Sequence, residues 1–258
     1  MISWDWLWLL GAGFFGGVLN SIAGGGSFIT FPALLMAGVP AISANATNTF
    51  ASCAGYLSGA YAFKEELRRY HQVLPALISV SAVGGLMGAW LLLQTPAAVF
   101  QQAIPWLLLF ATLLFIFGSQ LNRLLKQLGR GHKRMARAAK AVLGLLLLLV
   151  CIYGGFFNAG LGIISLSYLA FAGYTDINVM NAMKLLISCV VSVIAIVVFV
   201  LQDQIAWLEG LLVLTGASVG GYLAARISRL VAAHYIRYFV MVISVLITSY
   251  FFMDTYAN

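Results

Sequence analysis

The sequence predicts an all-α membrane protein that crosses the bilayer several times and is built from two related halves. Of its 258 residues, 62% are hydrophobic and 8% are charged, whereas soluble domains carry about 25% charged residues. The apolar residues also gather in segments of about the length that a spanning helix needs. Finally, a set of Asn, Gly and Ser residues recurs in the same order in the second half of the chain.

Eight long apolar segments are candidate spanning helices, each close to the ~20 residues that cross the hydrocarbon core. They are residues 4–22, 42–63, 73–94, 99–121, 138–157, 177–201, 205–225 and 235–253. Two shorter apolar segments, 28–37 and 163–172, are expected to form half-helices or re-entrant arms. Pro96 and Pro105 suit the first positions of helices.

A glycine-rich segment separates the first long segment from the first short one. Residues 20–27 hold three consecutive glycines and two serines, and non-helical backbone at this depth must be buried in protein or line a wet cavity. A helix that begins at Ser27 would point its free N–H groups at the glycines, which is an arrangement that binds anions. A flexible turn between two helices is the alternative. A similar break occurs near Gly160.

The second half aligns with the first after a shift of 136 positions, or 138 near the start of each half. The matches divide the chain into a first transmembrane repeat (1–121), a basic cytoplasmic loop (122–137) and a second transmembrane repeat (138–258). Each repeat is expected to hold four long helices and one short half-helix. The aligned sets are Gly16, Gly17 and Asn20 with Gly154, Gly155 and Asn158; Asn45 and Asn48 with Asn181 and Lys184; Ser52 and Cys53 with Ser188 and Cys189; and Gly84 and Gly85 with Gly220 and Gly221.

The basic residues indicate how the two halves are oriented. The segment from Arg123 to Lys140 holds seven Lys and Arg residues and no acid, so we expect it on the cytoplasmic side. If each half crosses the membrane an odd number of times, 13 of the 14 basic residues face the cytoplasm. Both termini then face the periplasm, and the halves are inverted repeats. Eight crossings with parallel repeats are the alternative.

Lys184 is the one charged residue deep within a predicted span, which makes it a candidate functional residue. The alternative is a lysine that extends to the membrane surface. Its counterpart Asn48 would place an amide donor in the related position, so the pattern predicts an anion site near the midplane between the repeats. The candidate binding residues are Asn20, Gly24, Gly25, Gly26, Ser27, Asn45, Thr47, Asn48, Thr49, Asn158, Gly160, Gly162, Asn181 and Lys184.

Some of these residues have a second interpretation. Asn45 and Asn181 could equally cap helices or bond between helices. Gly25 is expected to be small for the approach of an anion and not only for packing shared by both halves, because its counterpart is Leu161. Asp176 is expected to cap the helix that carries Lys184.

These motifs together resemble the sulfite exporter TauE/SafE family, also called the four-toluene-sulfonate uptake permease group. The resemblance covers nearly the whole chain, and it implies transport of sulfite, sulfonates and related organosulfur anions across the bacterial inner membrane. Thr49 stands where many members have Lys, and Asn158 where many have Pro or Gly. The residues that carry the resemblance are Asn20 to Gly26, Pro32 to Leu35, Gly38, Ala44 to Asn48, Gly154 to Phe157, Gly160, Gly162 and Ala182 to Leu185.

The sequence therefore predicts a multi-pass secondary transporter, expected to export small organosulfur anions by alternating access, with an anion channel as the alternative. No nucleotide-binding, metal-binding or catalytic motif is present, so no enzymatic activity, cofactor or metal is expected. The net charge is +7. The Lys and Arg residues lie between the apolar segments, where they set the orientation in the membrane, so nucleic acid is not an expected partner. The expected partners are the bilayer, the anion, protons as a coupling ion and a second copy in a homodimer.

Overall fold

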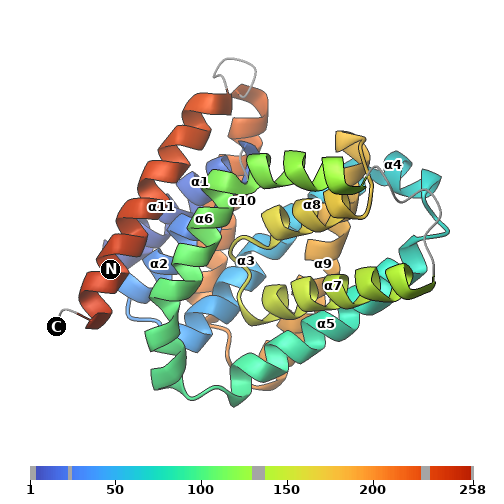
Figure 1. Cartoon of the computed structure of the whole chain (residues 1–258). Coiled ribbons are helices and arrows are strands. Elements are labelled where there is room, and N and C mark those ends of the chain that lie inside the picture. Colours follow the sequence, from blue (N-terminus) through green and yellow to red (C-terminus); the bar gives the residue numbers. More distant parts are fainter. Residues whose placement is uncertain (1–3, 23–24, 130–136, 228–232, 257–258) are drawn as a thin grey trace.

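The computed structural model describes residues 4–22, 25–129, 137–227 and 233–256, and the predicted all-α fold is confirmed there (Figure 1). These ranges form eleven helices. They are α1 (Trp4–Ile22), α2 (Ser27–Met36), α3 (Ala41–Ala62), α4 (Lys64–Arg69), α5 (Leu74–Gln94), α6 (Ala97–Gly129), α7 (Arg137–Phe156), α8 (Leu161–Phe171), α9 (Ile177–Leu201), α10 (Trp207–Ile227) and α11 (Ala233–Tyr256).

Four helices or parts of helices within these ranges are long and apolar enough to cross a membrane: residues 74–94, 97–118, 177–201 and 238–256. Shorter apolar helices lie at residues 6–20, 27–36, 141–156, 161–171 and 207–223. The two predicted half-helices are present as α2, which begins at Ser27, and α8. The chain thus has the composition and helix lengths of a polytopic membrane protein.

The helices differ from the sequence analysis in three places. The helix α4 was not predicted, because its charged residues interrupt the apolar pattern although Lys, Glu, Leu and Arg all favour helix. The helix α6 continues to Gly129, into the segment expected to be loop. Its leucines there recur three and four residues apart, which suits an amphipathic helix. Pro105 lies inside α6 rather than at a helix start; membrane helices tolerate such a proline when neighbours satisfy the freed carbonyl.

Two glycine-lined seams join the first half of the chain to the second. In the seam between α1 and α10, a Cβ atom added to Gly13 or Gly17 would contact the backbone of Val213 or Ala217. In the seam between α5 and α7, a Cβ on Gly88 would contact the carbonyl oxygen of Ile152. Residue numbers rise together along each pair, so both pairs run parallel. Small residues allow this close approach of membrane helices.

The contacts of Gly84 and Gly220 are close, as the sequence predicts, but the two glycines are not in equivalent places. A Cβ on Gly220 would contact the carbonyl of Phe14, and a Cβ on Gly88 would contact the carbonyl of Ile152. Phe14 and Ile152 are paired by the shift of 138, so the structural counterpart of Gly220 is Gly88. The shift of 136 pairs Gly220 with Gly84 instead, which is one helical turn away. The error arises because both helices carry glycine every four residues, and a shift of one turn keeps them on the same face.

The sequence shift pairs α3 with α9 and α6 with α11, and the two helices of each pair run antiparallel. Asn158 bonds to both Tyr56 of α3 and Ser192 of α9. One turn further along α3, Gly59 lies against Leu185, which precedes Ser192 in α9. Thr112 of α6 and Thr248 of α11, which are 136 positions apart, have their hydroxyl oxygens 3.1 Å apart. The hydroxyl of Tyr256, which follows Thr248 in α11, donates to the carbonyl of Gln102, which precedes Thr112 in α6, at 3.0 Å. The helices α6 and α11 therefore also run antiparallel.

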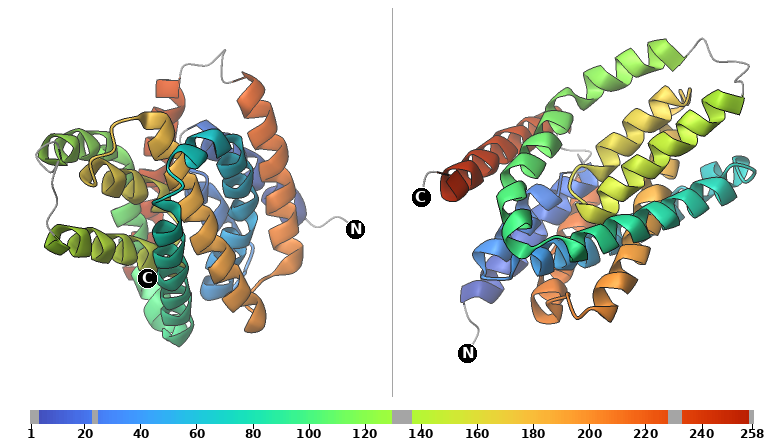
Figure 2. Two further views of the ribbon diagram at one scale, coloured as in Figure 1. Left: turned by 90° about the vertical axis from the view of Figure 1, so that its right-hand side faces the viewer. Right: turned by 60° about the horizontal axis from the view of Figure 1, so that its bottom comes forward.

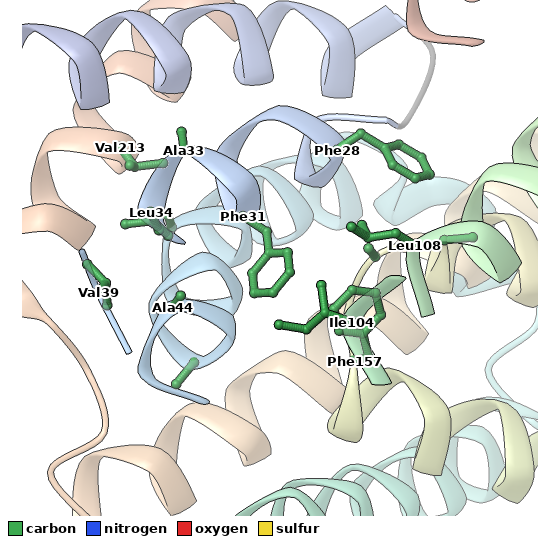
Figure 3. Close-up of a cluster of buried hydrophobic side chains, with 14 of the residues drawn as sticks. Phe28, Phe31, Ala33, Leu34, Val39, Ala44, Ile104, Leu108, Phe157 and Val213 are labelled. Atoms are coloured by element: carbon green, nitrogen blue, oxygen red, sulfur yellow. The ribbon is translucent and has the colours of Figure 1, made fainter. Parts of the chain in front are cut away.

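A buried apolar cluster lies between α2, α6 and the segment that joins α7 to α8. The Phe31 and Phe157 rings meet edge to face with centroids 5.4 Å apart, and Figure 3 shows both beside Ile104. This core holds α2 close to the break between α7 and α8. Figures 1 and 2 show the start of α1 and the end of α11 on the opposite side of the molecule from α4 and from the neighbouring ends of α6 and α7.

We expect Gly88→Leu and Gly220→Leu each to lower the yield of folded protein and its melting temperature, because the added side chain meets backbone that cannot move aside. Gly144→Leu is the matched control, since a Cβ at Gly144 has nothing within 4 Å. Fluorescence size-exclusion chromatography and thermal melts of the detergent-solubilised protein measure both effects. Wild-type yield and melting temperature in the two seam variants would contradict the close packing.

Candidate functional site

The break between α7 and α8 is built from buried, non-helical backbone. The helix α7 ends at Phe156 and α8 begins at Leu161. Gly160 has a φ of 84°, which a side chain would disfavour, so glycine suits this position. Phe157, Asn158 and Ala159 are buried. The chain thus turns back inside the protein, with the carbonyl end of one helix and the N–H end of another on either side of the turn.

Four side-chain hydrogen bonds hold this break in place. The Asn158 Oδ1 atom accepts from the Tyr56 hydroxyl at 2.9 Å, and its Nδ2 donates to Ser192 Oγ at 3.0 Å. The Tyr153 hydroxyl donates to the Ala159 carbonyl at 2.8 Å, and Asn45 Nδ2 donates to the Phe156 carbonyl at 3.0 Å. Asn158 therefore links α3, α9 and the break, and its amide is occupied by protein partners.

Lys184 lies against the first turn of α8. A Cβ added to Gly162 would lie 3.5 Å from Lys184 Cδ, so the aliphatic stem runs past this glycine. Its Nζ donates one hydrogen bond, to Asn181 Oδ1 at 3.2 Å. The predicted cap is confirmed, because the Asp176 carboxylate accepts from the Asn178 N–H at 2.8 Å. Of the predicted binding residues, the structure therefore places Lys184, Asn181 and Gly162 together.

The electrostatic character of this position is positive. The N-terminal end of a helix carries a partial positive charge and free N–H groups, and the Lys184 ammonium adds a full charge. Within the described ranges the one ion pair joins exposed Arg68 and Glu65, so no carboxylate there neutralises Lys184. An ammonium that has further hydrogens to donate, next to a helix N-terminus, is suited to an anion.

The corresponding position in the first half is closed by neutral hydrogen bonds. Asn48 is 1% exposed; its Oδ1 accepts from Thr30 Oγ1 at 2.5 Å, and its Nδ2 donates to Ser27 Oγ at 3.2 Å. Both ends of the amide are used within the protein. Thr30 was not among the predicted site residues. Its spacing of three from Ser27, which puts both on one face of α2, was the signal that could have identified it.

Gly25 is closely packed, so packing gives it a reason to be small, and its role in anion approach stays a prediction. A Cβ there would lie 2.6 Å from Val240 Cγ1 and 3.3 Å from Phe115 Cε2. Gly26 is equally enclosed, because a Cβ would lie 2.5 Å from the Gly16 carbonyl and 2.9 Å from Asn20 Cβ. The start of α2 is therefore packed against α1, α6 and α11.

The remaining predicted residues lie apart from Lys184 or outside the described ranges. Thr47 Oγ1 accepts from the Ala206 N–H at 3.0 Å, and Thr49 Oγ1 donates to the Asn45 carbonyl at 2.9 Å. Gly24 lies outside the described residues. Asn20 sits where α1 meets α2 and α3, with its amide nitrogen 3.4 Å from a Cβ placed on Gly55.

The starts of α2 and α8 lie along the same two turns of α6. Phe115 packs against Phe28 near the start of α2, with ring centroids 5.9 Å apart. On the α8 side, Ala111 lies 3.2 Å from a Cβ placed on Gly160, and a Cβ on Gly118 would lie 2.6 Å from Ile163 Cγ2. The two half-helices therefore begin close together inside the bundle.

A half-helix that begins inside an apolar bundle beside a lysine without an ion-pair partner, as α8 does, is a feature of membrane transporters. Comparison with known proteins agrees. Residues 9–251 match the model of the family described as sulfite exporter TauE/SafE. The chain therefore belongs to the sulfite exporter TauE/SafE family.

Several bacterial relatives share nearly the full length of the chain. A "probable membrane transporter protein" of Haemophilus influenzae is 29% identical over 240 residues, which cover 92% of this chain and 90% of the relative. The "probable membrane transporter protein YfcA" of Escherichia coli K12 is 26% identical over 257 residues, covering 97% and 92%. "Probable membrane transporter protein ORF9" of a Sinorhizobium species is 29% identical over 238 residues, covering 91% and 87%. No solved structure gives a significant match.

We expect Asn158→Leu to destabilise the protein, because Tyr56 and Ser192 lose their shared partner inside the bundle. A buried polar group without a partner costs about 1–3 kcal/mol, and each kcal/mol corresponds to about 2–4 °C in a protein of this size. Thermal melts of the purified protein measure the change, and Ser79→Ala, at an exposed serine bonded to its own helix, is the control. A wild-type melting temperature for Asn158→Leu would show that these bonds do not hold the break.

Proposed function

We propose that this chain is a secondary transporter that exports small anions, with sulfite, sulfonates or other organosulfur anions as substrates, across a bacterial inner membrane. The observation that carries the proposal is Lys184, the single charged residue of α9, placed beside Gly162 at the start of α8. The family description supports sulfite as a substrate, and the relatives come from bacteria.

The proposed binding mode uses one half of the chain more than the other. The Lys184 ammonium pairs with the anion, while the Asn181 amide and the Gly162 N–H donate to its oxygens. The neighbouring N–H groups of Leu161, Ile163 and Ile164 already donate to backbone carbonyls. Asn48 contributes structure rather than charge, because Ser27 and Thr30 already occupy its amide. A sulfite or sulfonate group carries three oxygens on one sulfur, which suits several converging donors.

Transport by alternating access is supported by the antiparallel pairing of α3 with α9 and α6 with α11. Inverted repeats bring their equivalent helices together in opposite directions, and such transporters place the substrate at the interface of the repeats. We propose this relation for the two halves. An anion channel is the second candidate, favoured by the same buried positive position. Saturable counterflow in proteoliposomes supports the transporter, and single-channel currents support the channel.

Lys184→Ala should weaken sulfite binding by at least tenfold without lowering the melting temperature. A hydrogen bond to a charged group contributes about 1.5–3 kcal/mol, and about 1.4 kcal/mol corresponds to a factor of ten in affinity. Isothermal titration with sulfite, sulfoacetate, taurine and sulfate measures the loss and ranks the substrates. Lys64→Ala, at an exposed lysine above the Tyr61 ring, is the control. Undiminished binding by Lys184→Ala would exclude the proposed site.

The proposed orientation predicts that position 130 faces the cytoplasm and the C-terminus faces the periplasm. Arg130→Cys and Asn258→Cys are made in a protein that lacks Cys53, Cys151 and Cys189. A membrane-impermeant maleimide added to intact spheroplasts should label position 258 and not position 130. Strong labelling of position 130 from outside would rule out this topology. Absence of labelling at position 258, with position 130 also protected, would rule out an odd number of crossings for the second half.

A further inference from the structure

Asn45 has a buried acceptor that the protein leaves without a partner. The residue is 1% exposed, and its Nδ2 donates to the Phe156 carbonyl at 3.0 Å. Its Oδ1 has no hydrogen-bond partner; among the described residues, only Ser165 Oγ shares this property. Rotating the amide by half a turn does not help, because Oδ1 would then face the Phe156 carbonyl. The unsatisfied group is therefore an acceptor, not a misassigned donor.

The surroundings of Asn45 Oδ1 combine apolar packing with the carbonyl end of a helix. Ala44 and Ala46 are fully buried beside it in α3, and the Phe156 ring packs on Phe100 with centroids 5.7 Å apart. Phe156 is the last residue of α7, so the negative end of the helix dipole lies here. The Tyr153 carbonyl accepts from the Phe157 N–H and the Phe156 carbonyl accepts from Asn45, which leaves the Gly154 and Gly155 carbonyls at this helix end. An oxygen-lined position of negative potential in an apolar medium favours a positive ligand.

This position is distinct from the proposed anion site. Tyr56 and Ser192 meet on Asn158, and α3 and α9 run antiparallel through that point. Asn45 lies about 16 Å before Tyr56 along α3, and Lys184 about 12 Å before Ser192 along α9. The two residues are therefore on opposite sides of the crossing. The carbonyl end of α7 and the N–H end of α8 flank one break, and each end suits an ion of opposite charge.

We propose that Asn45 Oδ1 and the terminal carbonyls of α7 bind a monovalent metal cation of the sodium class, which is the ion coupled to anion transport. Neutral oxygen ligands suit hard cations. No group of three His, Cys, Asp or Glu residues that could hold a metal ion occurs in the part of the chain that the structure describes. An amide does not titrate, so Asn45 cannot carry protons as a carboxylate would. The coupling rests on the proposed function, whereas cation binding does not.

The test is the melting temperature of the purified full chain in choline chloride, titrated with NaCl or KCl at constant ionic strength. Wild type should be stabilised saturably by Na⁺ or K⁺ relative to choline, because a ligand that binds only the folded state raises its stability. Asn45→Leu should lose this response, and Asn45→Asp, which keeps an oxygen at the site, should retain it. Ser165→Ala, which removes the other unpartnered buried oxygen, should respond like wild type.

Identical melting temperatures in the three salts, or an unchanged response in Asn45→Leu, would overturn the proposal and leave a buried water as the partner of Oδ1. Lys184→Ala should keep the full cation response while it loses sulfite binding, so failure of the anion site and failure of the cation site are separately visible. In proteoliposomes, sulfite uptake should follow an imposed Na⁺ or K⁺ gradient in wild type and not in Asn45→Leu. A rate of sulfite uptake by wild type that does not change with either cation gradient would overturn the coupling.

Discussion

The fold depends on one constraint, which is that backbone broken at membrane depth must find its hydrogen bonds inside the protein. The break between α7 and α8 satisfies this through side chains from three helices. Asn45 and Tyr56 come from α3, Ser192 from α9 and Tyr153 from α7 itself. Because the break can exist only where these helices converge, α3 and α9 must cross at the centre of the bundle. The positions of Lys184 and Asn45 follow from that crossing.

The two breaks have equivalent places in the sequence but different chemistry. At the start of α2, Ser27, Thr30 and Asn48 form a closed neutral network, and glycines pack against neighbouring helices. At the start of α8, Lys184 keeps hydrogens to donate beside a glycine whose added Cβ would make only ordinary contact. Under the proposed relation between the two halves, only the second half carries a charged site. The sequence shift pairs Asn48 with Lys184, and this pair accounts for the difference in charge.

The glycine seams limit which parts of the molecule can move. The α1–α10 seam and the α5–α7 seam each join the first half of the chain to the second through backbone contact. A rigid rotation of one half against the other would separate both seams at once. We therefore expect alternating exposure of the site to use the short helices α2 and α8 and the bent helix α6 that lies beside both (Figure 1). The seams would act as the fixed frame.

The sequence by itself determined the features that depend on local composition. Apolar length predicts the spanning helices and the two short ones, an isolated charge marks Lys184, and Asp176 is recognisable as a cap because capping involves only neighbouring residues. Tertiary structure alone decided which polar residues bond within the protein and which keep a free donor or acceptor. Asn45 and Asn158 bond to backbone or side chains more than thirty positions away, and Gly25 is enclosed by Val240 of α11. Such partners leave no local pattern, because they meet only when helices distant in the chain pack together.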